Sequence, residues 1–235
     1  MEDFTTDLIP TDPTTTAVIA VGESISNFIN AAYDTDWYRF DVIAGQTYMI
    51  TLIKAPVSPD RLSDPYLYVY DSTGVRIATN DDSDTSLNSR VKFTATATET
   101  VFIEAAAFSD NIGEYMLSTA VLVEGTSGDD SLRGVNYVAD YLVGLAGNDT
   151  IIGYGGNDYI HGGAGNDSIL GLVGNDTIDG GKGADTIDSG EAHDTVFGGA
   201  GRDYVLMGTG DDLFIDDAQD GPRGSDTVYG DNGND

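Results

Sequence analysis

Residues 144–215 read GLAGNDTII GYGGNDYIH GGAGNDSIL GLVGNDTID GGKGADTID SGEAHDTVF GGAGRDYVL MGTGDDLFI, which is one nine-residue pattern repeated eight times. The sixth position of every copy is Asp, and the eighth position is always apolar. An Asp ladder and an apolar ladder that share one period over eight copies indicate a repeat architecture. This stretch therefore decides the fold of the C-terminal half.

Each copy combines a turn with a very short strand. Glycines at positions 1, 2 and 4 allow the left-handed backbone conformations of tight turns. Position 8 is mostly β-branched, which suits a strand with one side chain facing inward. Two copies then make one coil of 18 residues, and coils stack at roughly 4.8 Å. The sequence predicts a parallel β-roll whose inward residues are Leu132, Leu142, Ile151, Ile160, Ile169, Ile178, Ile187, Val196, Val205, Phe214 and Val228.

Stacking places aspartates 18 residues apart directly over one another. One column holds Asp140, Asp158, Asp176, Asp194 and Asp212, and the other holds Asp149, Asp167, Asp185 and Asp203. Like charges about 5 Å apart repel by roughly 3 kcal/mol at an effective dielectric constant of about 20, so the roll should need a cation in order to close. Calcium fits because it takes six or more oxygen ligands in flexible geometry, whereas magnesium requires a tight octahedron. Zinc is disfavoured because it prefers His or Cys, and the only histidines, His161 and His193, lie on different repeats.

The pattern resembles the RTX family of calcium-binding nonapeptide repeats, G-G-x-G-x-D-x-U-x, over about residues 124–235. The resemblance implies that each ion lies between two turns 18 residues apart. Carbonyls at positions 2 and 4 and the Asp of one turn would join carbonyls at positions 1 and 3 and the Asp of the next. One ion would use Gly163, Gly165, Asp167, Gly180, Lys182 and Asp185. A second would use Gly181, Gly183, Asp185, Gly198, Ala200 and Asp203, and a third Tyr154, Gly156, Asp158, Gly171, Val173 and Asp176. The implied metal-binding set is completed by Asp140, Asp149, Asp194, Asp212, Leu145, Gly147, Gly153, Gly155, Gly162, Ala164 and Gly174.

Some parts of the chain depart from the repeat. Val138 and Ala192 stand where position 4 is otherwise Gly, which weakens the sites that pair Asp140 with Asp158 and Asp194 with Asp212. Of seven sites expected between residues 140 and 212, five remain if these two fail. The stretch from Asp216 to Pro222 interrupts the register. Asp226 and Asp235 resume the series after it, but we expect them to bind nothing. Because the repeat stops in mid-copy at Asp235 and a solenoid needs a cap, we expect a fragment of a longer protein.

The N-terminal half has a different composition. Residues 1–122 hold only 4 of the 30 glycines, which indicates a domain boundary. We expect a tail at residues 1–14, a β-sandwich at residues 15–122 and the roll at residues 123–235. Apolar residues alternate over 38–42, 48–52, 66–70, 91–95, 101–105 and 115–117, separated by turns, which is typical of an antiparallel jelly-roll-like β-sandwich. The predicted fold class is therefore all-β throughout.

The sandwich resembles the bacterial pre-peptidase C-terminal (PPC) domain, a small sandwich attached to secreted peptidases. The resemblance is carried by the segments Asp34-Thr35-Asp36-Trp37-Tyr38, Ala44-Gly45-Gln46-Thr47-Tyr48, Asp64-Pro65-Tyr66-Leu67, Asn80-Asp81-Asp82-Ser83 and Gly113-Glu114-Tyr115. Some relatives of this sandwich bind calcium, and the collagen-binding modules of clostridial collagenases look similar.

Two groups of sandwich residues have two interpretations each. Asp34, Asp36, Asp81, Asp82 and Asp84 could form a further calcium site, but we expect the first two to cap a turn and the others to lie in a solvated loop. Trp37 and the stripe Tyr66, Tyr68 and Tyr70 could bind a ligand, but at strand spacing we expect them in the core.

Composition excludes several classes of function. A net charge of −30 argues against nucleic acids and anionic membranes, because both attract basic surfaces. There is no cysteine and no apolar run long enough to span a membrane, and the first residues, Met1-Glu2-Asp3-Phe4, lack the basic and apolar regions of a signal peptide. No metalloprotease, serine-hydrolase or phosphate-binding motif is present, so we expect no enzyme in this chain. Carboxylates are abundant enough for a glycosidase, but the repeat aspartates are better explained by a cation.

We expect a non-catalytic calcium-binding module of a larger secreted protein. Resemblance to the RTX family implies type I secretion, which reads no N-terminal signal, and folding on extracellular calcium. The pairing with a PPC-like sandwich suggests a serralysin-like parent by analogy only. We expect a monomer. The alternative is an adhesin, or a module that binds extracellular matrix or glycans, with the sandwich as the ligand-binding domain.

Overall fold

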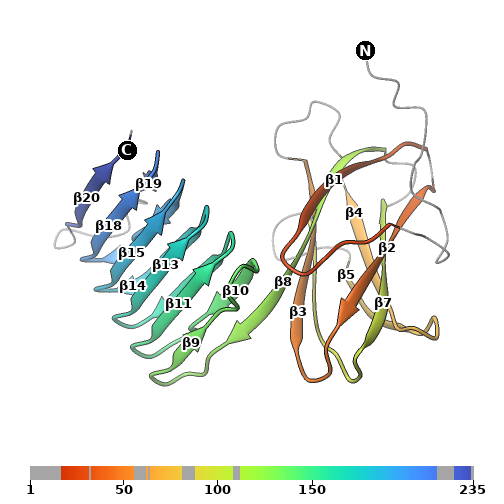
Figure 1. Cartoon of the computed structure of the whole chain (residues 1–235), viewed down its shortest axis with the longest axis horizontal. Helices are drawn as coiled ribbons and strands as arrows, with labels where there is room; N and C mark the ends of the chain where they lie inside the picture. The colour runs from red at the N-terminus through yellow and green to blue at the C-terminus, as the bar shows by residue number, and fades with distance from the viewer. Residues whose placement is uncertain are drawn as a thin grey trace, which may run out of the picture. The chain divides into compact units, whose positions relative to one another are not determined.

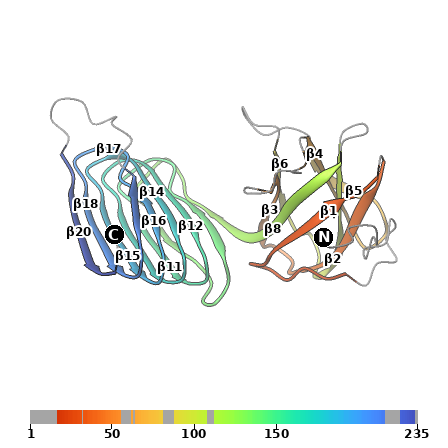
Figure 2. The same cartoon turned by 90° about the horizontal axis from the view of Figure 1, so that it is seen from above.

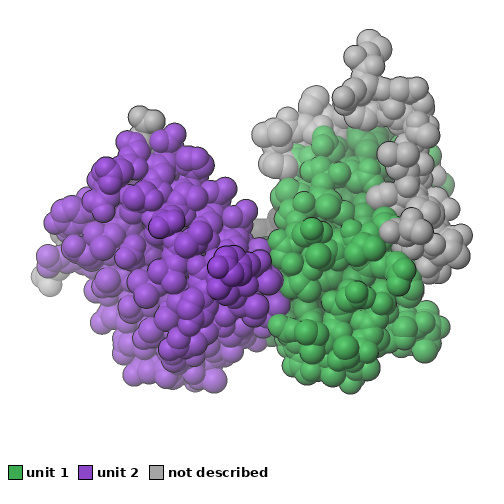
Figure 3. All heavy atoms as spheres, viewed as in Figure 1, with its two compact units in different colours: residues 1–120 green, residues 121–235 purple. Residues whose placement is uncertain are grey.

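The computed structural model describes residues 17–31, 33–55, 62, 64–80, 88–107, 112–215 and 225–233, and all regular elements among them are strands. The chain divides into two compact units, residues 1–120 and residues 121–235 (Figure 3). The all-β prediction is therefore confirmed for the described residues. None of them belongs to a helix that could cross a membrane.

The first unit is a sandwich of two antiparallel sheets. Its strands are β1 (Ser24–Ile29), β2 (Thr35–Val42), β3 (Thr47–Lys54), β4 (Pro65–Tyr70), β5 (Arg76–Asn80), β6 (Ser89–Thr94), β7 (Glu99–Ala107) and the first part of β8 (Gly113–Glu124). One sheet has the order β1-β8-β3-β6 and the other the order β2-β7-β4-β5 (Figure 1). The predicted sandwich is confirmed, and the structure adds β1 and β5 to the strands that alternation had indicated.

Strand alternation fills the sandwich core from both sheets. On β2, Tyr38, Phe40 and Val42 are buried, and on β4 the buried residues are Pro65, Leu67 and Val69. The remaining β4 side chains, from the stripe Tyr66, Tyr68 and Tyr70, are half-exposed on the opposite face, as is Trp37 on β2. The prediction that these aromatics form the core is therefore wrong. Both faces of β4 are apolar in sequence, and packing against the second sheet selects the aliphatic face.

The second unit is a parallel β-roll of two sheets. One contains β10 (Asp140–Val143), β12 (Tyr159–Ala164), β14 (Thr177–Gly183), β16 (Thr195–Phe197), β17 (Ala200–Gly201) and β19 (Leu213–Ile215). The other contains β9 (Ser131–Arg133), β11 (Thr150–Gly155), β13 (Ser168–Val173), β15 (Thr186–Glu191), β18 (Tyr204–Thr209) and β20 (Thr227–Asn232). Neighbouring strands pair in parallel, as Figures 1 and 2 show. Thr150 pairs with Ser168 and Tyr159 with Thr177, which confirms the 18-residue coil.

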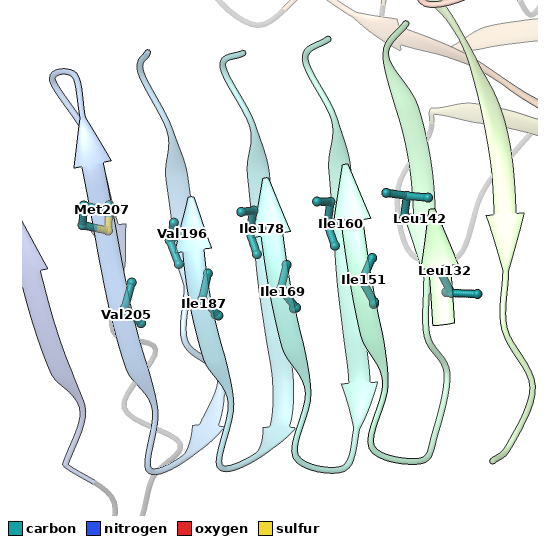
Figure 4. Close-up of a cluster of buried hydrophobic side chains, with 10 residues drawn as sticks. All are labelled: Leu132, Leu142, Ile151, Ile160, Ile169, Ile178, Ile187, Val196, Val205 and Met207. Carbon is teal, nitrogen blue, oxygen red and sulfur yellow. The ribbon is translucent and has the colours of Figure 1, made fainter. Parts of the chain in front are cut away.

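The core of the roll is the predicted apolar ladder except at its C-terminal end, where Phe214 is only partly buried and Val228 is 39% exposed, so the prediction that Val228 faces inward is wrong. Residues from Leu142 to Val205 at position 8 are fully buried, and they line up along the roll axis in Figure 4. Met207 joins them at the C-terminal end. Because each coil contributes only two such side chains, the core is thin and the turns hold a large share of the polar groups.

The first rung of the roll comes from β8. Its last residues, Val121–Glu124, pair in parallel with β10, and Leu142 lies opposite Val123. Val123 packs against the buried ladder. Residues Val121–Glu124 therefore form the first rung of the roll.

Candidate metal centres

Two columns of buried aspartates follow the turns of the roll. Every ladder aspartate from Asp140 to Asp212 is at most 5% exposed. The columns arise because the pairing register repeats every 18 residues and so superimposes equivalent turns. The structure thus brings together the aspartates that the sequence spacing predicted.

One oxygen of each ladder carboxylate from Asp149 to Asp212 accepts a hydrogen bond from the preceding coil. The backbone N–H of Asp149 donates to Oδ1 of Asp167 at 2.8 Å, and the N–H of Asp167 donates to Oδ1 of Asp185 at 2.8 Å. The same bond joins Asp158 to Asp176 in the other column. A backbone N–H in this position holds the carboxylate in one orientation within the turn.

The second oxygen has no such partner in the central coils. Oδ2 of Asp149, Asp158, Asp167, Asp176 and Asp185 is buried, and no donor among the described residues reaches it. A buried polar atom without a hydrogen bond costs about 1–3 kcal/mol, and more when it is charged. These oxygens therefore require a proton or a cation.

Backbone carbonyls converge on the same points. A Cβ placed on Gly162 would lie 2.6 Å from Oδ2 of Asp167 and 2.5 Å from the carbonyl oxygen of Gly180. Gly171 is bounded in the same way by Asp176 and the carbonyl of Ser189. Oxygens that meet without a donor between them form a cradle for a hard cation. No three His, Cys, Asp or Glu side chains of the described residues cluster, so carbonyls would have to supply most ligands.

Burial makes the charged carboxylates unfavourable without a cation. It raises the pKa of Asp158 and Asp185 to about 7 and that of Asp140 and Asp176 to about 6. Backbone N–H groups oppose this shift, and neighbouring aspartates add to it for Asp158 and Asp185. A divalent cation in the cradle would lower the pKa of these carboxylates again, since an opposite charge at ligand distance favours the ionised form.

Position 3 carbonyls also take part in the coil-to-coil hydrogen bonds. The N–H of Gly165 donates to the carbonyl of Lys182 at 2.7 Å, and that of Gly156 donates to Val173 at 3.1 Å. A carbonyl oxygen has two lone pairs, so this bond leaves one for a cation. The residues that the family resemblance groups around one ion thus lie on hydrogen-bonded neighbouring turns.

The two irregular turns keep the backbone pattern. Ala192 adopts φ +87° and donates its N–H to Thr209 at 2.8 Å, as a position 4 glycine would. The N–H of Val138 donates to the carbonyl of Gly155 at 3.0 Å. In this turn the residue with the left-handed backbone conformation is Tyr137, at φ +64°. Neither substitution therefore interrupts the ladder of turns.

The first turns differ from the rest because protein donors reach their second carboxylate oxygen. Oδ2 of Asp130 accepts from the N–H of Thr126 at 2.6 Å and from its hydroxyl at 2.9 Å. Oδ2 of Asp140 accepts from the N–H of Val135 at 2.5 Å, while its buried Oδ1 has no donor among the described residues. The N-terminal end of the roll is thus partly satisfied by its own hydrogen bonds.

The register continues beyond the irregular stretch. Tyr204 pairs with Thr227, and the N–H of Asp203 donates to Oδ1 of Asp226 at 2.9 Å. Asp226 therefore follows Asp203 in its column although 23 residues separate them, as predicted for the resumed series. Asp235 and the interruption at residues 216–222 lie outside the described residues.

A second ladder, at position 5, was missed by the sequence reasoning. Oδ1 of Asn148 accepts from the N–H of Asn166 at 2.8 Å, and Oδ1 of Asn157 accepts from the N–H of Asn175 at 2.9 Å. His193 takes the same place, since its Nδ1 accepts from the N–H of Asp211 at 2.8 Å. The available signal was the Asn that precedes the ladder Asp in the first four of the eight copies.

The sandwich aspartates have structural partners. Asp36 is fully buried, and its Oδ2 accepts from the hydroxyl of Tyr115 at 2.5 Å and from Asn27 at 3.2 Å. Oδ2 of Asp34 accepts from the N–H of Asn30 at 3.2 Å, within the turn before β2. Capping is therefore observed for Asp34 but not for Asp36, which belongs to a buried network. Asp81, Asp82 and Asp84 lie outside the described residues.

Two family models match the chain. Residues 136–169, 170–205 and 221–235 match the RTX calcium-binding nonapeptide repeat, and residues 34–107 match the bacterial pre-peptidase C-terminal domain. The roll therefore carries repeats that bind Ca²⁺, and the sandwich contains a PPC domain. Both are non-catalytic domains.

Solved structures that resemble the chain each cover less than half of it. The pre-peptidase C-terminal domain of a collagenase from Bacillus anthracis is 14% identical over 44% of this chain and 92% of its own length, with a TM-score of 0.37. PliG, a periplasmic inhibitor of g-type lysozyme, is 15% identical in Aeromonas hydrophila, over 44% of this chain and 97% of its own, with a TM-score of 0.29. The Salmonella Typhimurium PliG is 14% identical over 45% of this chain and 98% of its own length, with a TM-score of 0.30. No curated protein matches the chain.

Proposed function

We propose that this chain is a non-catalytic module of a larger secreted protein, and that its roll folds when it meets extracellular calcium. The observation that carries the proposal is the row of buried carboxylate oxygens without donors in the central coils, each facing a backbone carbonyl. For one ion the proposed ligands are Gly163, Gly165 and Asp167 with Gly180, Lys182 and Asp185.

The switch follows from the energetics of the metal-free roll. Without calcium, closing the coils buries charged carboxylates in two columns, which desolvation and mutual repulsion oppose. A chain rich in Asp and Gly with a thin core then stays unfolded. Calcium binding and folding become one equilibrium, because the ligands converge only in the coiled state.

Export is the setting in which such a switch is useful. The families of both domains are typical of secreted proteins. An unfolded roll in calcium-poor cytosol would pass through a narrow type I channel, and folding outside would oppose its return. A secreted metalloprotease of the serralysin type as parent is supported by analogy alone.

Hydrogen exchange of the whole chain, read by mass spectrometry, tests the proposal. In chelator, peptides from residues 149–215 should exchange freely, and calcium at roughly 0.1–1 mM, the range of extracellular modules, should protect them cooperatively. Magnesium at the same concentration should not. Peptides from β2, β3 and β7 serve as the internal control. A roll that is already protected in chelator would exclude the export switch and leave calcium as a stabiliser only.

A second candidate function is ligand binding by the sandwich, as in an adhesin. The half-exposed Trp37 and Tyr70, which stack with ring centroids 5.1 Å apart, favour it. Retention of the chain on collagen or insoluble polysaccharides, with and without chelator, is the test. Absence of retention on all of them would count against this function.

A further inference from the structure

The outer face of the sheet β2-β7-β4-β5 carries half-exposed aromatic side chains. Tyr66, Tyr68 and Tyr70 follow one another along β4, with successive ring centroids 4.4 Å and 6.2 Å apart. Trp37 extends from β2 across β7 and stacks on Tyr70 with an angle of 29° between the rings. Such rings offer a large contact area and lose little conformational entropy on binding.

A pocket of about 350 Å³ lies beside this stack. It is lined by Trp37, Tyr70, Ser72, Thr73, Gly74 and Phe102. The volume is at the small end of the range for ligand pockets, about 300–1,000 Å³. A side chain added at Gly74 would meet no atom within 4 Å, so the pocket is open on the side of the turn. Its size suits one ring of a larger ligand.

The turn that forms the rim of the pocket is preorganised. Oδ1 of Asp71 accepts from the N–H of Thr73 at 2.9 Å, from its hydroxyl at 2.7 Å and from the N–H of Val75 at 2.9 Å. The hydroxyl of Thr73 is the main reason that the pKa of Asp71 is lowered. A rim that is ordered before binding reduces the entropy lost when a ligand enters.

Two carboxylates, of Glu104 and Glu99, each accept hydrogen bonds from a residue that lines the pocket, although neither glutamate is part of the lining. The indole N–H of Trp37 donates to Thr35 at 3.1 Å, and the hydroxyl of Tyr70 donates to Glu104 at 2.7 Å. The Oε2 of Glu99 accepts from the backbone N–H of Ser72 at 3.2 Å and from the hydroxyl of Ser72. The aromatic donors are therefore used within the protein, and carboxylates remain to receive hydrogen bonds from a ligand. Hydroxyl donors suit this rim better than the carbonyl acceptors of an extended peptide.

We propose that this pocket binds one ring of a neutral glycan. The C–H face of the sugar would pack on Trp37 and Tyr70, and its hydroxyls would donate to Glu99 and Glu104. Acidic glycans are disfavoured by the net charge of −30. The inference rests on the second candidate function, ligand binding by the sandwich, and does not depend on calcium binding by the roll.

Trp37 is the only tryptophan of the chain, so its fluorescence reports this pocket alone. The whole chain in 2 mM calcium, roughly an extracellular concentration, is titrated with cellotetraose, N-acetylchitotetraose and maltotetraose. At least one of these neutral tetrasaccharides should give a saturable change in Trp37 emission, and tetragalacturonate should give none. No saturable change with any neutral tetrasaccharide would overturn the proposal, as would a change produced only by decaproline.

Two matched variants locate the site. Tyr70→Ala should weaken binding at least about tenfold, the equivalent of about 1.4 kcal/mol, while Tyr66→Ala, on the same face outside the pocket, should change it by less than about twofold. Circular dichroism checks that both variants are folded. Equal effects of the two variants would overturn the site. Retention on insoluble polysaccharide without a Trp37 response would also overturn this site, yet leave the second candidate function standing.

Discussion

A carboxylate that is buried without a donor is stable as an anion only beside a cation, and Asp185 shows this at the scale of one residue. Its Oδ1 accepts from the N–H of Asp167, while its Oδ2 faces the carbonyl of Gly198 across a cradle at Gly180. The first oxygen has a structural role, and the second is available for a metal. A change from carboxylate to amide separates the two roles, because the amide keeps the accepting oxygen and loses the charge.

Asp185→Asn should therefore keep the turn but lose calcium. We expect a loss of on the order of 3 kcal/mol in the unfolding free energy at saturating calcium, as when one partner of a buried ion pair is removed. Asp188→Asn, at the half-exposed position 9 of the same copy, is the matched control. Chemical denaturation and calorimetric titration measure the two effects. Equal stability of both variants would contradict the ligand role.

The raised pKa values make the metal-free roll sensitive to pH. The pKa of Asp158 and Asp185 is about 7 in the folded roll, because burial disfavours the charged form, and about 3.9 in an unfolded chain. Protonation therefore favours folding: the stabilisation is complete below about pH 4 and is lost as the pH rises towards 7.

Acidification of metal-free protein from pH 8 to 5 should accordingly increase protection of residues 149–215 against hydrogen exchange, after correction for the intrinsic exchange rate. Calcium affinity should fall over the same interval, since protons and calcium compete for the same oxygens. Loss of protection on acidification would show that the buried carboxylates do not control folding.

Leu172 occupies a position where the repeat normally has glycine. Its φ is +83°, and the equivalent residue one coil later is Gly190 at φ +112°. The left-handed conformation costs a non-glycine residue about 1–2 kcal/mol, so Leu172→Gly should raise the thermal midpoint despite the greater freedom of glycine when unfolded. Leu170→Gly, in the regular part of β13, should lower it. A lower midpoint for Leu172→Gly would indicate that this side chain stabilises the turn.

At the scale of elements, the coils of the roll differ in how much they need calcium. The rung formed by Val121–Glu124 continues from β8, and Thr126 and Val135 supply donors to Asp130 and Asp140. Asp140 keeps one buried oxygen, Oδ1, without a donor, and each turn from Asp149 to Asp185 has a bare Oδ2. Dependence on calcium should thus increase along the chain after the first coil.

Subsaturating calcium should therefore protect β9 and β10 before β14 and β15. Hydrogen exchange of peptides from each strand, followed through the titration, measures this order. Thr126→Val, which removes the hydroxyl donor to Asp130, should reduce the difference in protection between β9–β10 and β14–β15. Simultaneous protection of all strands would contradict a graded roll and indicate a single cooperative unit.

At the scale of the whole molecule, each unit has its own buried core, and the aspartate columns lie in residues 121–235 alone. Calcium removal should unfold the roll and leave the sandwich folded. The unfolding transition of the sandwich, followed by Trp37 fluorescence, should persist in chelator. Its unfolding free energy should change by less than about 0.5 kcal/mol, as expected for a site that does not contact the calcium ligands. Loss of the Trp37 transition in chelator would show that the sandwich depends on the calcium-loaded roll.

The nine-residue period alone determined the roll, its 18-residue coil, its apolar ladder and its aspartate columns. It could do so because a solenoid is built from contacts between equivalent positions of neighbouring coils, so sequence spacing translates directly into spatial neighbours. Strand alternation determined the sandwich for the same local reason.

Only the tertiary structure decided which face of β4 is buried, because its aliphatic and aromatic faces are both apolar and the opposing sheet covers one of them. It also decided how Asp226 rejoins the column, since pairing of β20 with β18 restores hydrogen bonds that a strict period would have lost. The donors of Thr126 and Val135 likewise became visible only in three dimensions. Burial and hydrogen-bond satisfaction are properties of the assembled turns, and no single repeat contains them.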